Sequence, residues 1–165
     1  MKAGDLVFLG LGSNIQPEKN LGLAISLLSQ DVQIHQIAST WETPPYGGGG
    51  GNYLNTALSI HTELSQNVLK HTVLKPVETK LGRVRSPDKF APRTIDVDIL
   101  IYHGQIIEPR LWTLPFLALP MADLLPDLAD PSSGKSLLEI ARHFAKEGHA
   151  TLRKDLQFVI PSQHA

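Results

Sequence analysis

The segment PRTIDVDILIY, residues 92 to 102, constrains the fold most, because its second part has the pattern of a buried β-strand. Its branched residues recur at two-residue spacing: Ile95, Val97, Ile99 and Ile101. Alternate residues of a strand face the same side of a sheet, so we expect all four in the core. The same rule places Asp96 and Asp98 together on the opposite face, with a rise of about 6.5 to 7 Å between them. The chain is therefore expected to build a sheet that presents two neighbouring carboxylates.

The length of 165 residues predicts one domain, residues 1–165, which buries roughly 70% of the surface that the unfolded chain exposes. The chain has no cysteine, which excludes disulfides and thiolate zinc sites and suits a reducing compartment. The N-terminal residues lack the apolar core and cleavage site of a signal peptide, and no segment approaches the roughly 20 apolar residues that span a bilayer. We expect a cytoplasmic location.

The charges of the chain are nearly balanced. Lys and Arg together number 15, and Asp and Glu number 16, which gives a net charge of -1. A global basic field for nucleic acid or anionic membrane is absent, so we expect neither as a partner. Any site for a polyanion therefore has to be local. Separately, we expect the protein to be a monomer.

Strands and helices alternate irregularly along the chain. We expect strands over residues 7–13, 32–42, 52–64, 95–102, 105–107 and 156–160, and helices over 17–28, 65–81, 121–128 and 136–146. Ser65 can cap the second helix and Gly82 can end it, whereas Pro76 should bend or break it. The residues TPPYGGGGG after residue 42 predict a long loop. This order favours an α+β fold, with a mainly antiparallel sheet and helices packed on it, over a parallel doubly wound fold.

The expected strand over 52–64 alternates between two faces of different character. The strand over 52–64 places Leu54 and Leu58 on one face and Tyr53 and Asn55 on the other, which is typical of a half-buried strand. An aromatic ring beside an amide that both donates and accepts suits a flat heteroaromatic ligand. Ordinary packing of the tyrosine is the alternative.

Arginines are concentrated around the two acids. Four of the six arginines of the chain lie between residues 83 and 110: Arg83, Arg85, Arg93 and Arg110. Guanidinium groups suit bidentate phosphate binding, and Mg²⁺ is usually shared between one or two carboxylates and substrate phosphates. An acid pair among arginines therefore indicates phosphoryl transfer, in which the protein positions and neutralises phosphates. Acids that face solvent within a surface salt-bridge network are the alternative.

Other motifs indicate no site. GLGSN is too short for a dinucleotide fingerprint, and SSGKS lacks the upstream glycine of a phosphate loop. The seven histidines show no zinc-ligand spacing.

Five motifs, in order, resemble the 6-hydroxymethyl-7,8-dihydropterin pyrophosphokinase family: LGLGSNIQPEKNL, WETPPYG, NYLNTALSI, LGRVR and PRTIDVDILIY. The resemblance runs from about residue 7 to residue 128. It implies a ferredoxin-like α+β fold and transfer of pyrophosphate from ATP to the hydroxymethyl group of the pterin, with release of AMP, in folate biosynthesis. It also implies two magnesium ions as cofactors, with ATP as co-substrate.

The resemblance also implies roles for individual residues. Asp96 and Asp98 would bind both magnesium ions, and together with Arg83 and Arg93 they would form the catalytic set. The pterin would contact Thr43, Pro44, Tyr46, Tyr53, Asn55 and Phe116. The ATP would contact Glu78, Arg83, Arg85, Phe90, Arg93, Ile99, Arg110 and Thr113. The family's mobile loops would correspond to the glycine run at 47–51 and to SPDKFAP.

The sequence departs from the family pattern after Pro115. The family has a further short segment between the positions of Pro115 and Phe116, with a histidine and an arginine that contact the ATP phosphates. Loss of one such donor can lower a rate by about 100- to 1,000-fold. An impaired enzyme, or a protein that binds pterin or nucleotide without catalysis, is therefore the alternative. An RNA-binding ferredoxin-like module is disfavoured, because the exposed aromatic pair and the basic surface are missing.

Overall fold

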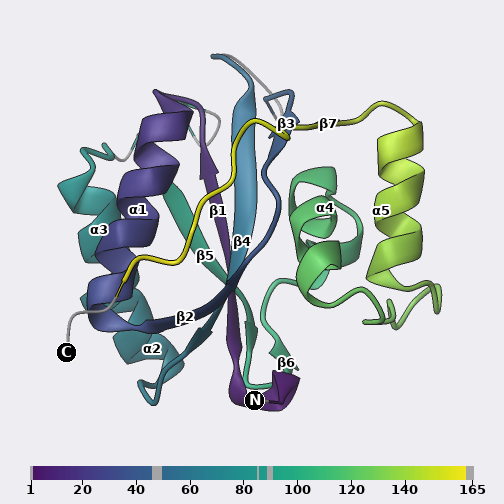
Figure 1. Cartoon of the computed structure of the whole chain (residues 1–165), viewed down its shortest axis with the longest axis horizontal. Helices are drawn as coiled ribbons and strands as arrows, with labels where there is room; N and C mark the ends of the chain where they lie inside the picture. Colours follow the sequence, from purple (N-terminus) through teal and green to yellow (C-terminus); the bar gives the residue numbers. More distant parts are fainter. Residues whose placement is uncertain (1, 46–49, 85, 89–90, 163–165) are drawn as a thin grey trace.

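A central antiparallel sheet divides the molecule, with helices on both of its faces (Figure 1). The computed structural model describes residues 2–45, 50–84, 86–88 and 91–162. The strands of the described chain are β1 Val7–Ser13, β2 Gln33–Ile37, β3 Trp41–Thr43, β4 Tyr53–His61, β5 Asp96–Tyr102, β6 Gln105–Ile106 and β7 Thr151–Leu152. Their order in the sheet is β6-β5-β1-β4-β3-β7, with β2 also paired to β4. The expected α+β class with an antiparallel sheet is confirmed.

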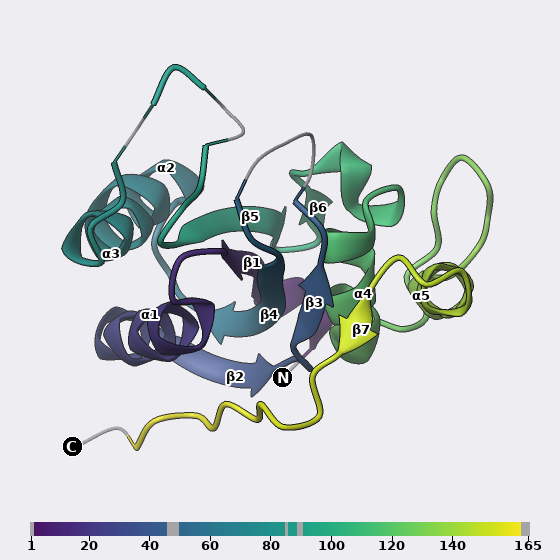
Figure 2. The ribbon, with the colours of Figure 1, turned by 90° about the horizontal axis from the view of Figure 1, so that it is seen from above.

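The helices form two groups. On one face lie α1 Pro17–Asp31, α2 Gln66–Leu69, the π-helical segment η2 Lys70–Leu74 and α3 Lys75–Lys80, and on the other lie α4 Pro115–Leu124 and α5 Leu137–Lys146 (Figures 1 and 2). The described chain also contains two short 3-10 helices, η1 Ala3–Asp5 and η3 Pro109–Trp112. None of its helices is long and apolar enough to cross a membrane.

Each face of the sheet has its own hydrophobic core. Leu9 and Leu58 pack with Leu21 of α1 in the first core, whereas Phe8 and Ala57 pack with α4 and α5 in the second. The central strand β4 is consequently buried along nearly its whole length. The expectation of a half-buried strand is wrong here, because α4 covers part of the face that the alternation assigned to solvent.

A β-bulge interrupts the alternation of β5. Leu9 of β1 pairs with Ile99 and Phe8 pairs with Ile101, so that Leu100 is an extra residue on β5. Ile95, Val97 and Ile99 lie in the first core as expected, but Ile101 joins the second core. The expectation for Ile101 is wrong because one inserted residue reverses the faces of all that follow.

The expected strand over 32–42 is divided into β2 and β3. Both pair with β4, and between them the Ala38 N–H donates to the Ala57 carbonyl at 2.8 Å. The expected strand over 156–160 is wrong: among the described residues the C-terminal strand is β7, and Leu156 and Phe158 instead pack against the first core. The helix expected over 121–128 begins earlier, at Pro115, and ends at Leu124.

The helix after Ser65 adapts to Pro76 through a π-turn. The Ser65 hydroxyl accepts from the Val68 N–H, and Gly82 ends the helix with a φ of 81°. The Lys75 N–H donates to the Lys70 carbonyl, five residues earlier. This wider turn makes room for the Pro76 ring, which would otherwise clash with the carbonyl four residues earlier, while the N–H that proline lacks stays without a substitute. The bend or break expected at Pro76 is therefore present as a π-helical turn just before the proline.

We predict that Leu21→Ala lowers the free energy of unfolding by about 2–5 kcal/mol, because Leu21 is fully buried between α1 and the sheet. Leu23→Ala is the control on the same helix, since Leu23 is 42% exposed. The control should change stability by less than about 0.5 kcal/mol in urea unfolding followed by circular dichroism. Equal losses in the two variants would contradict the placement of α1.

Candidate active site

A cavity of about 610 Å³ opens on the second face of the sheet, beside α4. Strands β1, β4 and β5 contribute its floor, and η2, α3 and α4 contribute its sides. Gly10 and Gly12 of β1 are paired with Asp98 and Asp96 of β5, so the two acids lie beside the residues with no side chain. The acids therefore face a concave site.

Most of the predicted site residues line this one cavity. They are Thr43, Pro44, Tyr53, Asn55, Glu78, Arg83, Arg93, Asp96, Asp98, Arg110 and Phe116. Ile99 is instead part of the first core, and Thr113 lines a second hollow beside α5. Tyr46, Arg85 and Phe90 lie outside the described residues, as do residues 47–49 of the glycine run.

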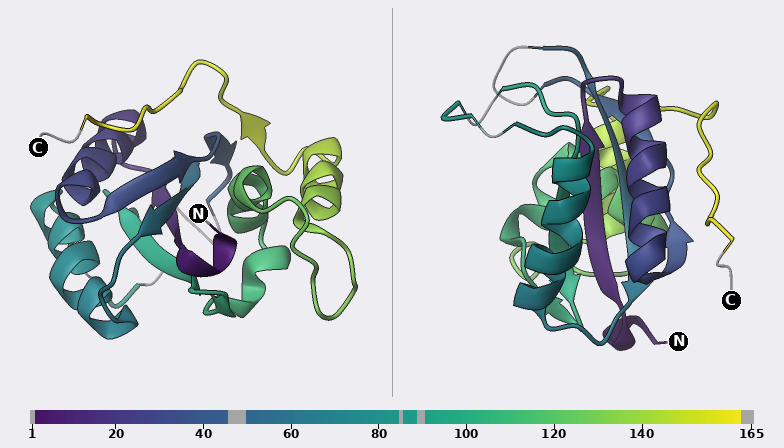
Figure 3. Two further views of the ribbon diagram at one scale, coloured as in Figure 1. Left: turned by 60° about the horizontal axis from the view of Figure 1, so that its bottom comes forward. Right: turned by 90° about the vertical axis from the view of Figure 1, so that its left-hand side faces the viewer.

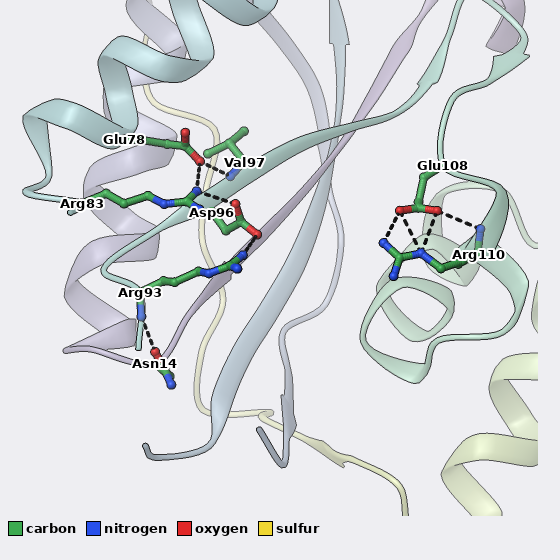
Figure 4. Close-up of polar contacts among 8 residues, drawn as sticks. All are labelled: Asn14, Glu78, Arg83, Arg93, Asp96, Val97, Glu108 and Arg110. Carbon is green, nitrogen blue, oxygen red and sulfur yellow. Dashed lines mark hydrogen bonds and ion pairs between the residues drawn. The ribbon is translucent and has the colours of Figure 1, made fainter. Parts of the chain in front are cut away.

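Asp96 is held between two arginines (Figure 4). Its Oδ1 accepts from Arg83 Nη1 at 2.6 Å, and its Oδ2 accepts from Arg93 Nη1 at 2.9 Å. Arg83 Nη1 also donates to Glu78 Oε2 at 2.6 Å, and the same oxygen accepts from the Val97 N–H at 3.0 Å. The side chains of Arg83 and Glu78 are only 11% and 6% exposed, so this group is not the solvated surface network that the spacing also allowed.

Asp98 completes the acid pair. Asp98 is exposed to solvent within the cavity, yet the surrounding walls remove part of the hydration of its carboxyl group. This desolvation, followed by the charge of Asp96, raises the pKa of the Asp98 carboxyl to about 7. Burial likewise raises the pKa of the Glu78 carboxyl. A cation beside Asp98 would relieve the repulsion between the two carboxylates.

The acid pair fits a hard cation that takes further ligands from outside the protein. Within residues 2–45, 50–84, 86–88 and 91–162, no group of three or more His, Asp or Glu residues is suited to hold a metal ion. Two carboxylates are nevertheless the usual protein share for Mg²⁺, which keeps several waters and binds substrate phosphates. Asp96 and Asp98 are therefore the residues that could hold such ions.

A polar slot lies at the β3–β4 side of the cavity. Asn55 Nδ2 donates to Thr43 Oγ1 at 2.8 Å, and both side chains are buried. Asn55 Oδ1 has no protein donor among the described residues, so it can accept from a ligand. A Cβ at Gly12 would approach Asn55 Oδ1 to 2.8 Å, which means that glycine is required there for the amide to lie over the strand. Half-buried Tyr53 stands beside this slot.

Arg110 contributes charge from another wall of the cavity. Its Nη2 donates to Glu108 Oε1 at 2.7 Å, and its backbone N–H donates to Glu108 Oε2 at 2.8 Å. Figure 4 shows this pair set apart from the Asp96 group. The cavity therefore carries guanidinium groups in two places, as an extended polyphosphate or nucleotide would require.

Sequence reasoning missed several residues of the site. Asn14 Oδ1 accepts from the Arg93 N–H at 2.7 Å (Figure 4), and Asn14 Nδ2 donates to the Gly51 carbonyl at 3.3 Å. Asn14 therefore joins the segment before β5 to the segment before β4. The signal was present, because Asn14 ends the GLGSN motif, whose glycines form part of the floor. Sequence reasoning also missed three charged residues that line the cavity: Lys70, Lys75 and Glu108.

Comparisons with known proteins agree with this geometry. The family model described as 7,8-dihydro-6-hydroxymethylpterin-pyrophosphokinase (HPPK) matches residues 8–126. A 2-amino-4-hydroxy-6-hydroxymethyldihydropteridine pyrophosphokinase of Synechocystis sp. is 32% identical over 143 residues, which are 80% of this chain and 72% of that protein. The protein of the same name from Aquifex aeolicus is 33% identical, over 81% of this chain and 88% of its own.

Solved structures share the fold. The Plasmodium falciparum HPPK-DHPS wild type with SDX-DHP has a TM-score of 0.64 at 11% sequence identity and matches 89% of this chain. The match covers 47% of that solved chain, so this protein spans about half of its length. At this identity the likeness supports the fold alone.

We predict that Glu78→Ala lowers the free energy of unfolding by about 1–3 kcal/mol, because the buried Val97 N–H loses its acceptor and Arg83 loses one of its two carboxylates. Glu63→Ala is the control, since Glu63 is exposed. The control should stay within about 0.5 kcal/mol of the parent protein in chemical denaturation. Unchanged stability of the Glu78 variant would show that this carboxylate does not hold β5 against α3.

Proposed function

Because this chain belongs to the 7,8-dihydro-6-hydroxymethylpterin-pyrophosphokinase family, we propose that it transfers pyrophosphate from ATP to 6-hydroxymethyl-7,8-dihydropterin, in folate biosynthesis. The hydroxymethyl oxygen attacks the β-phosphorus, and the bond from that phosphorus to the α–β bridging oxygen breaks. AMP leaves with the bridging oxygen, and the hydroxyl proton is released. The observation that carries the proposal is one cavity that holds both the acid–arginine group and the Asn55 slot.

The slot at Asn55 and Thr43 supports pterin binding. Asn55 Oδ1 accepts a hydrogen bond from the pterin edge, and the backbone near Pro44 completes this edge recognition. Tyr53 and Phe116 supply the aromatic surfaces against the pterin ring. Tyr46 belongs to the same proposed set, although it lies outside the described residues.

The arginines support binding of the ATP phosphates. Arg83 donates to one carboxylate oxygen of Asp96 and Arg93 donates to the other, and both arginines line the cavity. Arg93 faces the transferred group in this proposal, because its backbone is fixed by Asn14 and its guanidinium is directed by Asp96. Glu78 acts on the nucleotide indirectly, by holding Arg83. Arg110 takes the more distant part of ATP.

Asp96 and Asp98 would hold the two magnesium ions of this proposal. When bound, magnesium neutralises phosphate charge and orients the reacting oxygens. The raised pKa of Asp98 supports this assignment, since a carboxylate crowded by another one gains most from a nearby cation. Arg83, Arg85, Ile99, Thr113 and Phe90 keep the nucleotide roles that the resemblance implies, as proposals.

A non-catalytic binding protein is the less favoured alternative. The curated relatives are named pyrophosphokinases, and this cavity keeps both carboxylates with Arg83 and Arg93. Helix α4 does begin directly at Pro115, where the family pattern has its further segment. The two cores share one sheet, which supports residues 1–165 as a single domain. The monomer and the cytoplasmic location remain predictions.

We predict that incubation with ATP, Mg²⁺ and 6-hydroxymethyl-7,8-dihydropterin yields AMP and the pterin pyrophosphate, since the nucleotide must lose both terminal phosphates together. Chromatography of the nucleotides measures this, with a reaction that lacks pterin as the control. Formation of ADP would contradict pyrophosphate transfer. Binding of both ligands in calorimetry without any product would establish the binding protein instead.

We predict that Asp98→Asn lowers kcat by at least about 100-fold, because a neutral amide no longer holds a metal ion against the phosphates. The fold should remain, and thermal stability should be unchanged or higher, since desolvation by the cavity walls and the charge of Asp96 already disfavour the charged form of Asp98. Asp127→Asn is the control, because Asp127 is exposed and lies outside the cavity lining.

Calorimetric titration with Mg²⁺ in the presence of an unreactive ATP analogue supplies a second readout. Weaker binding is expected for Asp98→Asn and unchanged binding for Asp127→Asn. Full turnover by the Asp98 variant would remove the metal role of this residue.

A further inference from the structure

The C-terminal segment after α5 crosses the edge of the sheet and reaches α1 (Figure 3). Its first part, β7, pairs with β3, with Trp41 opposite Leu152 and Glu42 opposite Thr151. The family model matches only residues 8–126, so this segment lies outside the matched region. Its contacts are nevertheless with a strand that lines the candidate active site through Thr43.

Arg153 is the centre of these contacts. Its Nη1 donates to Glu42 Oε1 at 2.9 Å, its Nη2 donates to Glu18 Oε1 at 2.9 Å, and its side chain also bonds both oxygens of Asp155. The Arg153 N–H donates to the Thr40 carbonyl at 2.9 Å, just before β3. Its side chain is 23% exposed, which is low for an arginine beyond the edge of a sheet.

Glu42 connects Arg153 to the residues next to the cavity. Its second oxygen, Oε2, accepts from Asn52 Nδ2 at 3.0 Å, so one carboxylate connects Arg153 to the residue before β4. The bond from Asn52 and then the bond from Arg153 lower the pKa of the Glu42 carboxyl. Glu42 thereby holds the two ends of the loop between β3 and β4 together, with Arg153 as its cation.

The neighbouring residues form the polar slot of the cavity. Thr43 follows Glu42 and pairs with Tyr53, and its Oγ1 accepts from Asn55 Nδ2 at 2.8 Å. Successive side chains of a strand point to opposite sides, so a shift of Glu42 on one side moves Thr43 on the other. β3 spans only Trp41–Thr43, and few ladder bonds resist such a shift.

We infer that Arg153 is a positioning residue for the pterin end of the cavity, and that it acts through Glu42 on Thr43 and Asn55. This inference rests on the proposed function, because it uses the pterin as the ligand of the slot. The hydrogen bonds described for the ATP side form a separate group: Arg83 and Arg93 each donate to Asp96, and Arg83 also donates to Glu78 of α3.

The test is steady-state kinetics of Arg153→Gln with both substrates varied. We expect the KM for the pterin to rise about three- to tenfold, and the KM for ATP to change by less than about twofold, as loss of a partly exposed charged hydrogen bond would give. Arg153→Lys keeps the charge but not the fork of donors, and it should give an intermediate KM for the pterin.

Two control variants separate this role from general stability. Arg142→Gln removes an exposed arginine of α5, and Glu18→Gln removes another partner of Arg153 without touching β3. Both should keep the KM for the pterin of the parent protein. Glu42→Gln should raise it, and the double variant with Arg153→Gln should be no worse than the worse single variant, because both changes break the same connection.

The outcomes distinguish the two proposals. A parent protein that forms no AMP from ATP and pterin overturns the proposed function. A parent protein that does so, together with an Arg153→Gln variant whose two KM values are unchanged or rise equally, overturns the positioning role alone. If Arg153→Gln does not fold, Glu42→Gln decides: an unchanged KM for the pterin overturns the inference, and a selective rise supports it.

Discussion

The carboxylate of Asp96, shared between Arg83 and Arg93, is the interaction on which the rest of the site depends. It joins the end of α3, through Arg83 and Glu78, to β5 and to the loop directly before β5. Because Arg83 and Glu78 are nearly buried, an uncompensated charge there would be costly, and each member holds the others in place. The guanidinium groups are thus oriented before any ligand arrives, which is the condition for electrostatic stabilisation of a transferred phosphate.

A sheet with two covered faces makes this arrangement possible. α1 and α3 pack on one face over the first core, whereas α4 and α5 leave part of the other face hollow. Over this part β1 carries Gly10 and Gly12, opposite the acids of β5. The absence of side chains on β1 gives room for Leu100 beside Gly10 and for the Asn55 amide, which a Cβ at Gly12 would displace. The GLGSN motif therefore contributes to the site because its glycines form part of the cavity floor and let neighbouring side chains approach β1 closely.

The two ends of the cavity are supported by different parts of the molecule. Asn14, between β1 and α1, fixes the backbone of Arg93 at the proposed phosphate end. At the other end, β3 lies between β4 and the C-terminal strand β7, and Glu42 receives bonds from both Asn52 and Arg153. The last described part of the chain thus supports the proposed pterin end, whereas Asn14 supports the proposed phosphate end together with Glu78 and Arg83.

The local pattern of the sequence determined the strands with clear alternation, the cap at Ser65, the irregularity at Pro76 and the common face of Asp96 and Asp98. Each of these follows from chain geometry over a few residues. The tertiary structure alone decided which faces were covered, so it buried both sides of β4 and moved Ile101 to the second core through the bulge at Leu100. It also decided the partners of Asn14, Glu42 and Arg153, since a hydrogen bond between residues 111 positions apart leaves no periodic mark in the sequence.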